Sequence, residues 1–227
     1  ITNMLRDFVH QQKTEHFTNS SYATGPGKDG IFNVLDVGCG NGYTLQILKD
    51  NFPKLHFTGL ELNDSLRGIA KKSLSKLSIG VLKADIRKKE TLKQFDIDIL
   101  ICQRVIINIM NPVHQKKALE NLLNVVSDGG LLVFIESFKS GMISLNNARK
   151  EFQLEALTPA HHNLYLSDDF FNFPGLEEFD LSQKEFLSTH YFVSRVLHQS
   201  FLDASKHNFV RNSEFVSFFS HAFPHSI

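Results

Sequence analysis

A glycine-rich turn between a short apolar strand and a helix limits what this chain can fold into more than any other feature. The strand is predicted over residues 31–37, the turn contains Gly38, Gly40 and Gly42, and a helix is predicted over 43–50. Glycines let the backbone turn tightly and approach a ligand without a Cβ in the way. Doubly wound sheets bind their ligands at the carboxyl ends of their strands. The turn therefore predicts a ligand-binding α/β fold.

Strands and helices continue to alternate after this turn. Further strands are predicted over residues 55–60, 79–83, 97–102 and 131–136, with helices over 64–77 and 112–126. Short, largely apolar strands separated by helices favour a parallel sheet that is covered by helices on both faces. We therefore expect an α/β, doubly wound, mostly parallel, seven-stranded sheet of the Rossmann-like kind.

The alternation stops after residue 136. Residues 137–175 are predicted to be a partly helical insertion after the fifth strand, and two strand-like runs, 179–187 and 190–198, suggest a hairpin that adds an antiparallel last strand. We expect one domain, 1–227. Its parts are an N-terminal helix and loop (1–30), a core (31–136), the insertion (137–175), the terminal hairpin (176–199) and a tail (200–227).

The overall charge is balanced, with 24 lysines and arginines against 24 aspartates and glutamates. This balance disfavours nucleic acid as a partner, and we interpret Lys71-Lys72 and Arg87-Lys88-Lys89 as solvated surface. The apolar runs are too short to span a bilayer, so no membrane association is predicted. The two cysteines, Cys39 and Cys102, lack metal-ligand spacing, which favours a reducing, cytoplasmic setting.

An acidic residue before the glycines indicates the charge of the ligand. Asp36 precedes Gly38, and its carboxylate would repel a pyrophosphate but attract a cationic amino-acid group. A dinucleotide-binding G-x-G-x-x-G turn would also place a glycine at position 43, where this chain has Tyr43. The loop therefore predicts a ligand with a positive end and no phosphates.

The stretch from Asp36 to Gly42 resembles the first motif of class I S-adenosylmethionine-dependent methyltransferases, D/E-x-G-x-G-x-G, and the resemblance covers residues 31–136. It implies S-adenosyl-L-methionine as cofactor and S-adenosyl-L-homocysteine as product. It also implies that Glu61 holds the ribose hydroxyls, that Asp85 holds the adenine amino group, and that Gln103 lines the reactive end. A helix-capping role is the alternative for Asp85. The predicted cofactor residues are Asp36, Gly38, Cys39, Gly40, Glu61, Leu62, Asp85, Ile86 and Gln103.

The acceptor must lie in line with the transferred methyl group, and a neutral hydroxyl must also lose a proton. An imidazole titrates near neutral pH, so His162 or His161 is the candidate general base, with surface or capping histidines as the alternative. The predicted catalytic residues are His162, His161, Tyr165 and Arg104, and the predicted acceptor-binding residues are Asn108, Glu136, Arg149 and Asn163. Asp168 and Asp169 come after these histidines without recognised ligand spacing, so no metal site is predicted.

The insertion also resembles that of small-molecule methyltransferases associated with bacterial surface-polysaccharide, or capsule, biosynthesis. This resemblance implies that an oxygen of a sugar, a sugar nucleotide, or a phosphate- or phosphoramidate-type precursor is methylated. The alternatives are a non-catalytic cofactor-binding partner subunit, an N-methyltransferase and a nucleic-acid methyltransferase. The last is disfavoured because Gln103-Arg104-Val105-Ile106 stands where nucleic-acid enzymes have Asn/Asp-Pro-Pro-Tyr. The sequence leaves the oligomeric state open.

Overall fold

The computed structural model describes residues 1–18, 31–176, 189–202 and 213–222. It divides into two compact units, of which unit 1 contains residues 1–136 and 162–164, and unit 2 contains residues 137–161 and 165–227. The predicted boundary between core and insertion, at 136/137, coincides with the first division between the units.

Unit 1 is built on a five-stranded parallel sheet in the order β3-β2-β1-β4-β5. Its strands are β1 (Asn33–Val37), β2 (His56–Leu60), β3 (Gly80–Leu82), β4 (Ile97–Gln103) and β5 (Val126–Ile135). The predicted doubly wound parallel architecture is confirmed. Because the chain moves outward from β1 in both directions, the carboxyl end of β1 is the point where the strand order reverses, which is where such sheets bind ligands.

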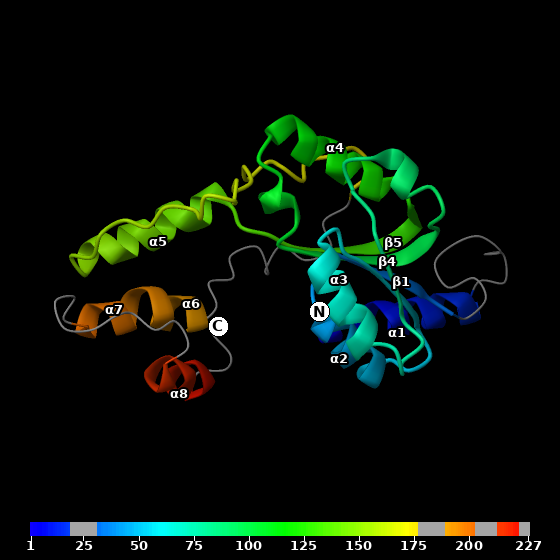
Figure 1. The fold of residues 1–227 in the computed structure, drawn as a ribbon, viewed down its shortest axis with the longest axis horizontal. Coiled ribbons are helices and arrows are strands. Elements are labelled where there is room, and N and C mark those ends of the chain that lie inside the picture. Colours follow the sequence, from blue (N-terminus) through cyan, green and yellow to red (C-terminus); the bar gives the residue numbers. More distant parts are fainter. Residues whose placement is uncertain (19–30, 177–188, 203–212, 223–227) are drawn as a thin grey trace. The chain divides into compact units, whose positions relative to one another are not determined.

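Helices cover both faces of this sheet (Figure 1). Those of unit 1 are α1 (Thr2–Thr18), α2 (Tyr43–Asn51), α3 (Asp64–Ser73) and α4 (Pro112–Leu123), with short 3-10 turns η1 (Lys89–Thr91) and η2 (Ile106–Asn108). The helices α1, α2 and α3 lie on one side, where Leu5, Leu45 and Leu74 share a buried core with alternate strand residues such as Val34 and Ile99. The helix α4 covers the opposite side.

Side-chain caps fix the start of two helices at the carboxyl edge of the sheet. Asn63 Oδ1 accepts hydrogen bonds from the amides of Ser65 and Leu66, both at 3.0 Å, and so begins α3. Asn111 Oδ1 caps α4 in the same way, and Pro112 occupies the first helical position, which requires no amide donor. Of the two neighbouring residues that could cap α3, Asn63 and Asp64, the structure uses Asn63.

The fifth strand begins earlier than predicted. It starts at Val126, and the pairing with β4 shifts between Ile97 and Ile99, so residues 127–130 form an irregularity within the strand. Gly130 is required there, because a Cβ would lie 2.9 Å from the carbonyl oxygen of Asp98.

The described residues of unit 2 form helices, turns and one isolated β-bridge between Phe138 and Leu166, and this corrects the predicted terminal hairpin. Its elements are α5 (Lys139–Glu151), α6 (Thr189–Phe192), the π-helical segment η4 (Val193–Leu197), α7 (His198–Phe201) and α8 (Glu214–Ala222). The strand predicted over 190–198 is wrong, because this segment is helical, whereas 179–187 lies outside the described residues. The described sheet therefore has five parallel strands, without the predicted antiparallel one.

Side-chain packing explains why the segment 190–198 is helical although its sequence predicts a strand. The segment is rich in β-branched and aromatic residues, which favour strands in sequence-based prediction. In the structure Val193 and Val196, three residues apart, are buried on one helical face, and the His198 ring stacks on Phe215 of α8 at 4.9 Å. Contacts with a helix later in the chain have outweighed the local preference. None of the helices in the described ranges is long and apolar enough to cross a membrane.

Candidate cofactor and acceptor site

The glycine loop is held against the end of β2. The amides of Gly38 and Cys39 both donate to the carbonyl oxygen of Leu60, at 2.7 and 2.9 Å. Gly38, Gly40 and Gly42 all have positive φ angles, of 70°, 57° and 85°. Glycine adopts this left-handed conformation at little cost. The predicted role of these glycines in turning the backbone therefore agrees with the geometry of the loop.

The three glycines differ in what surrounds them. A Cβ on Gly38 would lie 2.3 Å from Val105 Cγ2, and one on Gly42 would lie 2.7 Å from Leu74 Cδ1. A Cβ on Gly40 would meet nothing within 4 Å. The first and third glycines are thus needed for packing within the protein, while the backbone of the second faces open space in which a ligand can lie.

Asp36 is a buried carboxylate that lacks a hydrogen-bond partner on one oxygen. Its side chain is 3% exposed, and Oδ2 accepts no hydrogen bond from the residues that the structure describes. Burial, together with the nearby charge of Glu61, raises the pKa of Asp36 to about 7. An unsatisfied buried acceptor is unfavourable. A ligand ammonium group would satisfy this oxygen and neutralise the charge, so Asp36 fits the cationic amino-acid end of S-adenosylmethionine.

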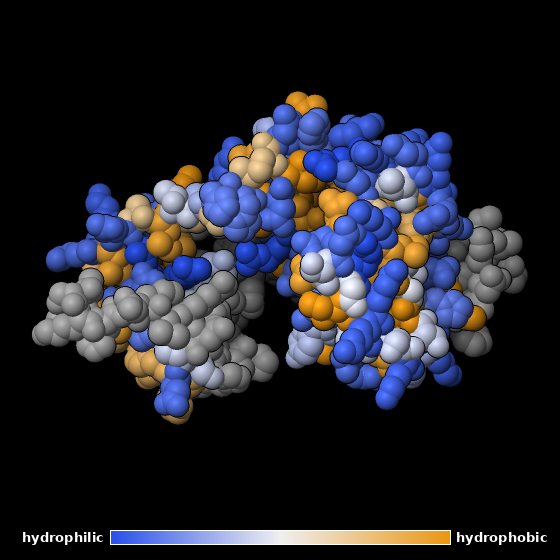
Figure 2. Space-filling model, viewed as in Figure 1, coloured by the Kyte–Doolittle hydropathy of each residue, from blue (hydrophilic) through white to orange (hydrophobic). Residues whose placement is uncertain are grey.

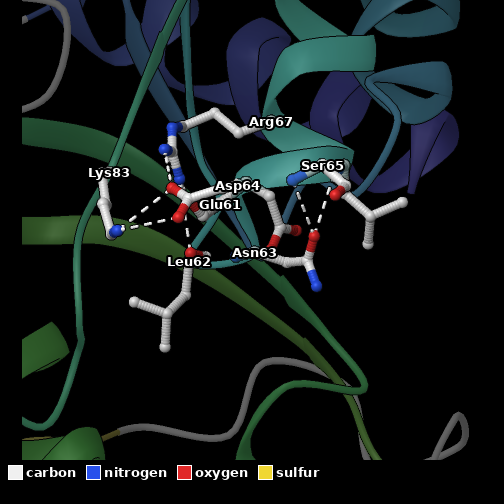
Figure 3. Close-up of polar contacts among 8 residues, drawn as sticks. Glu61, Leu62, Asn63, Asp64, Ser65, Arg67 and Lys83 are labelled. Carbon is white, nitrogen blue, oxygen red and sulfur yellow. Dashed lines mark hydrogen bonds and ion pairs between the residues drawn. The ribbon is translucent and has the colours of Figure 1, made fainter.

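Glu61 connects the glycine loop to the loop after β2. Its Oε2 accepts a hydrogen bond from the amide of Gly40 at 2.9 Å, and its Oε1 accepts one from the amide of Asn63 at 2.7 Å. Arg67 donates to the carbonyl oxygen of Glu61 at 3.0 Å and also pairs with Asp64 (Figure 3). Each carboxylate oxygen can accept more than one hydrogen bond, so Glu61 can still receive the two ribose hydroxyls that the resemblance assigns to it.

The loop after β3 carries Asp85 and Ile86, the residues expected at the adenine. The Asp85 carboxylate forms two side-chain hydrogen bonds with Arg87, at 2.8 and 2.7 Å, and these lower its pKa. Ile86 is buried, and its carbonyl oxygen accepts a hydrogen bond from the Asn121 side chain in α4 at 2.8 Å. The structure thus gives Asp85 an ion-pair partner that the sequence pattern did not indicate, and its contact with adenine stays a prediction.

Of the other predicted cofactor residues, Leu62 is 47% exposed, Cys39 is buried, and Gln103 is the exposed last residue of β4. All three lie at carboxyl ends of strands or in the glycine loop. Their contacts with the cofactor stay predictions.

The loop after β4 is fixed by Glu136, which comes directly after the last residue of β5. Glu136 Oε1 accepts hydrogen bonds from the amides of Val105 and Ile106, both at 2.9 Å, and Oε2 accepts one from Ile107 at 3.3 Å. Burial raises the pKa of Glu136, although these backbone donors act in the opposite direction. Since Val105 also packs on Gly38, Glu136 holds the acceptor-side loop against the cofactor loop. The structure therefore supports a positioning role for Glu136, and its predicted contact with the acceptor stays untested.

A second buried side chain brings residues 162–164 to this loop. Gln115 in α4 is 3% exposed and donates to the carbonyl oxygens of Ile106 and Leu164, at 3.2 and 2.8 Å. The Leu164 amide in turn donates to the carbonyl oxygen of Ile107 at 2.7 Å. His162, which is exposed, and Asn163, which is buried, therefore lie beside the loop that carries Arg104 and Asn108.

The roles of Gln115 and Asn121 were not predicted, although the sequence of α4 indicates that both side chains lie on its apolar face and need hydrogen-bond partners. They share the buried stripe of the helix with Ala118, Leu119 and Leu122. A polar side chain on an apolar helical face must find a partner. Both amides find backbone carbonyls of loops at the carboxyl edge of the sheet.

Arg104 has an unusual backbone for a residue other than glycine. Its φ angle is 56°, and its carbonyl oxygen accepts a hydrogen bond from the Asn108 side chain at 2.6 Å. The side chains of both residues are exposed. Left-handed conformations of such residues cost energy and occur preferentially at functional sites, which fits the predicted place of Arg104 at the acceptor.

The remaining predicted acceptor-site residues, His161, Tyr165 and Arg149, belong to unit 2. Arg149 is 4% exposed and donates to the carbonyl oxygens of Glu155 and Arg195 and to the side chain of Gln199. These contacts join α5 to α7 and the segment before it, so the structure gives Arg149 a role within unit 2. The predicted acceptor contacts of all three residues stay untested.

The described part of the chain contains no group of three histidine, cysteine, aspartate or glutamate side chains that could hold a metal ion. Asp168 accepts a hydrogen bond from Ser140 in the first turn of α5.

Fold and site together define a doubly wound cofactor-binding domain whose loop suits a ligand with a cationic end. Residues 34–130 match the family model described as a methyltransferase domain. The chain therefore carries a class I S-adenosylmethionine-dependent methyltransferase domain, and S-adenosylmethionine is the cofactor of this class.

Curated relatives share this domain and part of the chain beyond it. The malonyl-[acyl-carrier protein] O-methyltransferase of Bacillus anthracis is 23% identical over 179 residues, which cover 77% of this chain and 65% of the relative. That of Acetivibrio thermocellus is 24% identical over 192 residues, covering 80% and 65%. The chain thus spans about two thirds of the length of these relatives. Among solved structures, the S-adenosylmethionine-bound amino pentose methyltransferase CalS10 of Micromonospora echinaspora has 24% identity and a TM-score of 0.43, with 48% of this chain and 44% of CalS10 covered.

We predict that cofactor affinity depends on pH through Asp36. With a pKa of about 7 in the free protein, the carboxylate is ionised above neutral pH and becomes neutral below it, so its attraction for the ammonium group falls as the pH falls. The dissociation constant for S-adenosylmethionine should rise roughly tenfold or more between pH 7 and pH 5.5. Asp36→Asn should bind weakly at pH 7 and lose most of this dependence. Calorimetric titration of the wild type and of Asp36→Asn at several pH values measures the dissociation constant for S-adenosylmethionine. Equal pH dependence of this constant in the two proteins would contradict the role of Asp36.

We also predict that Glu136→Gln loosens the loop after β4. One oxygen is replaced by an amide nitrogen, which cannot accept the bond from the Ile107 amide. Hydrogen–deuterium exchange should show faster exchange across residues 105–107, while the exposed substitution Glu120→Gln in α4 serves as the control. Unchanged protection of residues 105–107 in Glu136→Gln would show that the carboxylate does not hold this loop.

Proposed function

We propose that this chain catalyses methyl transfer from S-adenosylmethionine to an oxygen atom of its acceptor. The observation that carries the proposal is the buried, partnerless carboxylate oxygen of Asp36 beside an intact glycine loop. A non-catalytic cofactor-binding subunit, which the sequence also allowed, would not need the ordered loop after β4 that Glu136 and Gln115 maintain next to this site.

Different residues at the carboxyl edge would bind different parts of the cofactor. Asp36 would hold the ammonium group, Glu61 the ribose hydroxyls, and the loop containing Asp85 and Ile86 the adenine. When bound, S-adenosylmethionine supplies a methyl group on a positively charged sulfur. Gln103 and the loop after β4 would then border the reactive end, so that the protein fixes the acceptor oxygen in line and excludes water.

We infer that the acceptor is a carboxylate carried on a thioester, as in a malonyl group on a carrier protein. The curated relatives that match most of this chain are malonyl-[acyl-carrier protein] O-methyltransferases. A malonyl thioester offers one ionised oxygen nucleophile, its free carboxylate, which needs no general base. Arg104, exposed at the carboxyl edge, has the planar donor geometry that suits a carboxylate. In the reaction an oxygen–methyl bond forms, the sulfur–methyl bond breaks, and the opposite charges cancel.

A hydroxyl of a sugar, a sugar nucleotide or a phosphorylated precursor is the second candidate acceptor. One observation favours it: the backbone hydrogen bond between Leu164 and Ile107 brings His162 and Asn163 beside the loop after β4. A hydroxyl must lose its proton as the methyl group is transferred, and His162 would accept that proton. We also propose a reducing, cytoplasmic setting, since Cys39 and Cys102 are both buried free thiols.

The two acceptors predict different results for His162→Ala. If a carboxylate is methylated, we expect turnover within about twofold of the wild type and a kcat that is nearly independent of pH between 7 and 9. If a hydroxyl is methylated, the missing proton acceptor should slow turnover by about 100-fold. The assay supplies methyl-labelled S-adenosylmethionine together with malonyl-[acyl-carrier protein], malonyl-coenzyme A or nucleotide sugars.

His56→Ala is the matched control, because His56 is also exposed but lies at the amino end of β2, away from the site edge. Labelling of the malonyl substrates but not the sugars supports the carboxylate proposal, and the reverse pattern supports the hydroxyl. Absence of transfer to every acceptor class, with the cofactor bound, would contradict the proposed activity on oxygen acceptors of these kinds.

A further inference from the structure

Positive charge is concentrated in one part of a chain whose net charge is zero. Between Asp64 and Lys93 there are nine lysines and arginines and three carboxylates, although the whole chain has 24 of each kind. This segment contains α3, β3 and η1, and β3 is an edge strand of the sheet. The sequence pattern alone favours ordinary solvated surface for these lysines, but their arrangement in the structure argues for more.

Lys83 and the start of α3 lie at the same edge of the sheet as the glycine loop, and Lys88 and Lys89 follow in the segment that leaves this edge. Lys83, Lys88 and Lys89 all come after the carboxyl end of β3, and all three are exposed. The amino end of α3 lies at this edge too, and a helix contributes partial positive charge at its amino end. The positive potential is therefore next to the site that the cofactor and the acceptor would use.

Two of the three carboxylates in this segment, Asp64 and Asp85, are paired within the protein, and the third, Glu90, is exposed. Asp64 accepts from Lys83 at 3.0 Å and also pairs with Arg67 (Figure 3), and the Asp85 carboxylate pairs with Arg87 at 2.7 Å. The side chains of Lys88 and Lys89 form no ion pair or hydrogen bond with the residues that the structure describes. Their charge is available to a partner.

Apolar side chains lie among these cations. Leu62, Leu66 and Leu82 are 47%, 40% and 41% exposed, and all three lie at the carboxyl end of β2, the start of α3 or the end of β3. On the face of unit 1 that carries α3, Figure 2 shows apolar side chains interspersed with hydrophilic ones. Leucines surrounded by lysines suit a protein surface that combines carboxylates with apolar residues. Single-stranded nucleic-acid sites instead offer aromatic rings on which bases stack.

We propose that the carboxyl-edge patch, defined as Leu66, Leu82, Lys83, Lys88 and Lys89, docks an acidic protein. We identify this protein with the carrier that presents the acceptor thioester, an identification that rests on the proposed function. Complementary charge would attract and orient the carrier, which raises the association rate and selects it over uncharged competitors. The leucines would supply apolar contact after the encounter.

The test compares two double charge reversals. Lys88→Glu/Lys89→Glu alters the patch, whereas Lys71→Glu/Lys72→Glu makes the same change of net charge at the opposite end of α3. Fluorescence anisotropy with labelled malonyl-[acyl-carrier protein] gives the dissociation constant near physiological ionic strength, where charges beyond about 8 Å are largely screened. We expect at least a tenfold rise for the first variant and less than a threefold rise for the second. Raising the salt concentration should weaken carrier binding by the wild type. It should also remove most of the difference in dissociation constant between the wild type and Lys88→Glu/Lys89→Glu.

A short acceptor separates docking from chemistry. With malonyl-N-acetylcysteamine, which lacks the carrier, Lys88→Glu/Lys89→Glu should keep wild-type kcat/KM, because neither lysine is placed in the cofactor or acceptor site. If no malonyl compound is methylated but the carrier still binds through Lys88 and Lys89, the proposed acceptor fails and the docking surface stands.

Three results would overturn the docking proposal. They are an equal effect of the two double variants on carrier binding, absence of carrier binding to the wild type, and tighter binding of a single-stranded RNA or of phosphatidylglycerol vesicles than of the carrier.

Discussion

Hydrogen bonds between the glycine loop and the end of β2 set the geometry on which the rest of the site depends. The carbonyl oxygen of Leu60 accepts from two loop amides, and the Glu61 carboxylate accepts from the Gly40 amide at 2.9 Å. These bonds hold the loop in a left-handed path that only glycines adopt readily. Because β1 and β2 are adjacent parallel strands, their carboxyl ends are close enough for one carboxylate to serve both loops.

This arrangement places two buried carboxylates close together. Asp36 is deprived of water and feels the charge of Glu61, and both effects raise its pKa. The protein alone therefore holds an unfavourable concentration of negative charge, which a cationic ligand would relieve. The same reasoning disfavours phosphates at this loop. The electrostatics thus select a methyl-donor cofactor over a dinucleotide, although both are bound by doubly wound sheets.

Sequence predicted the cofactor half of the molecule well because its pattern is local. Between residues 31 and 136, short strands and helices alternate along the sequence, and this alternation indicates a parallel sheet. The glycines of the cofactor loop and the acidic residues at the strand ends lie within the same short stretch. The acceptor side depends on contacts that join distant positions. Glu136 was expected to face an acceptor, yet it accepts hydrogen bonds from amides some 30 residues earlier in the chain. The segment 190–198 was expected to be a strand, but burial of Val196 and stacking of His198 on Phe215 of α8 accompany a helix there instead.

Direct binding measurements test the identification of S-adenosylmethionine as the cofactor. Calorimetric titration of the wild-type protein with S-adenosylmethionine and, separately, with NADH compares the two ligand classes that this fold accommodates. We expect saturable binding of S-adenosylmethionine with one site per chain, and no detectable heat with NADH. Binding of NADH without binding of S-adenosylmethionine would contradict it.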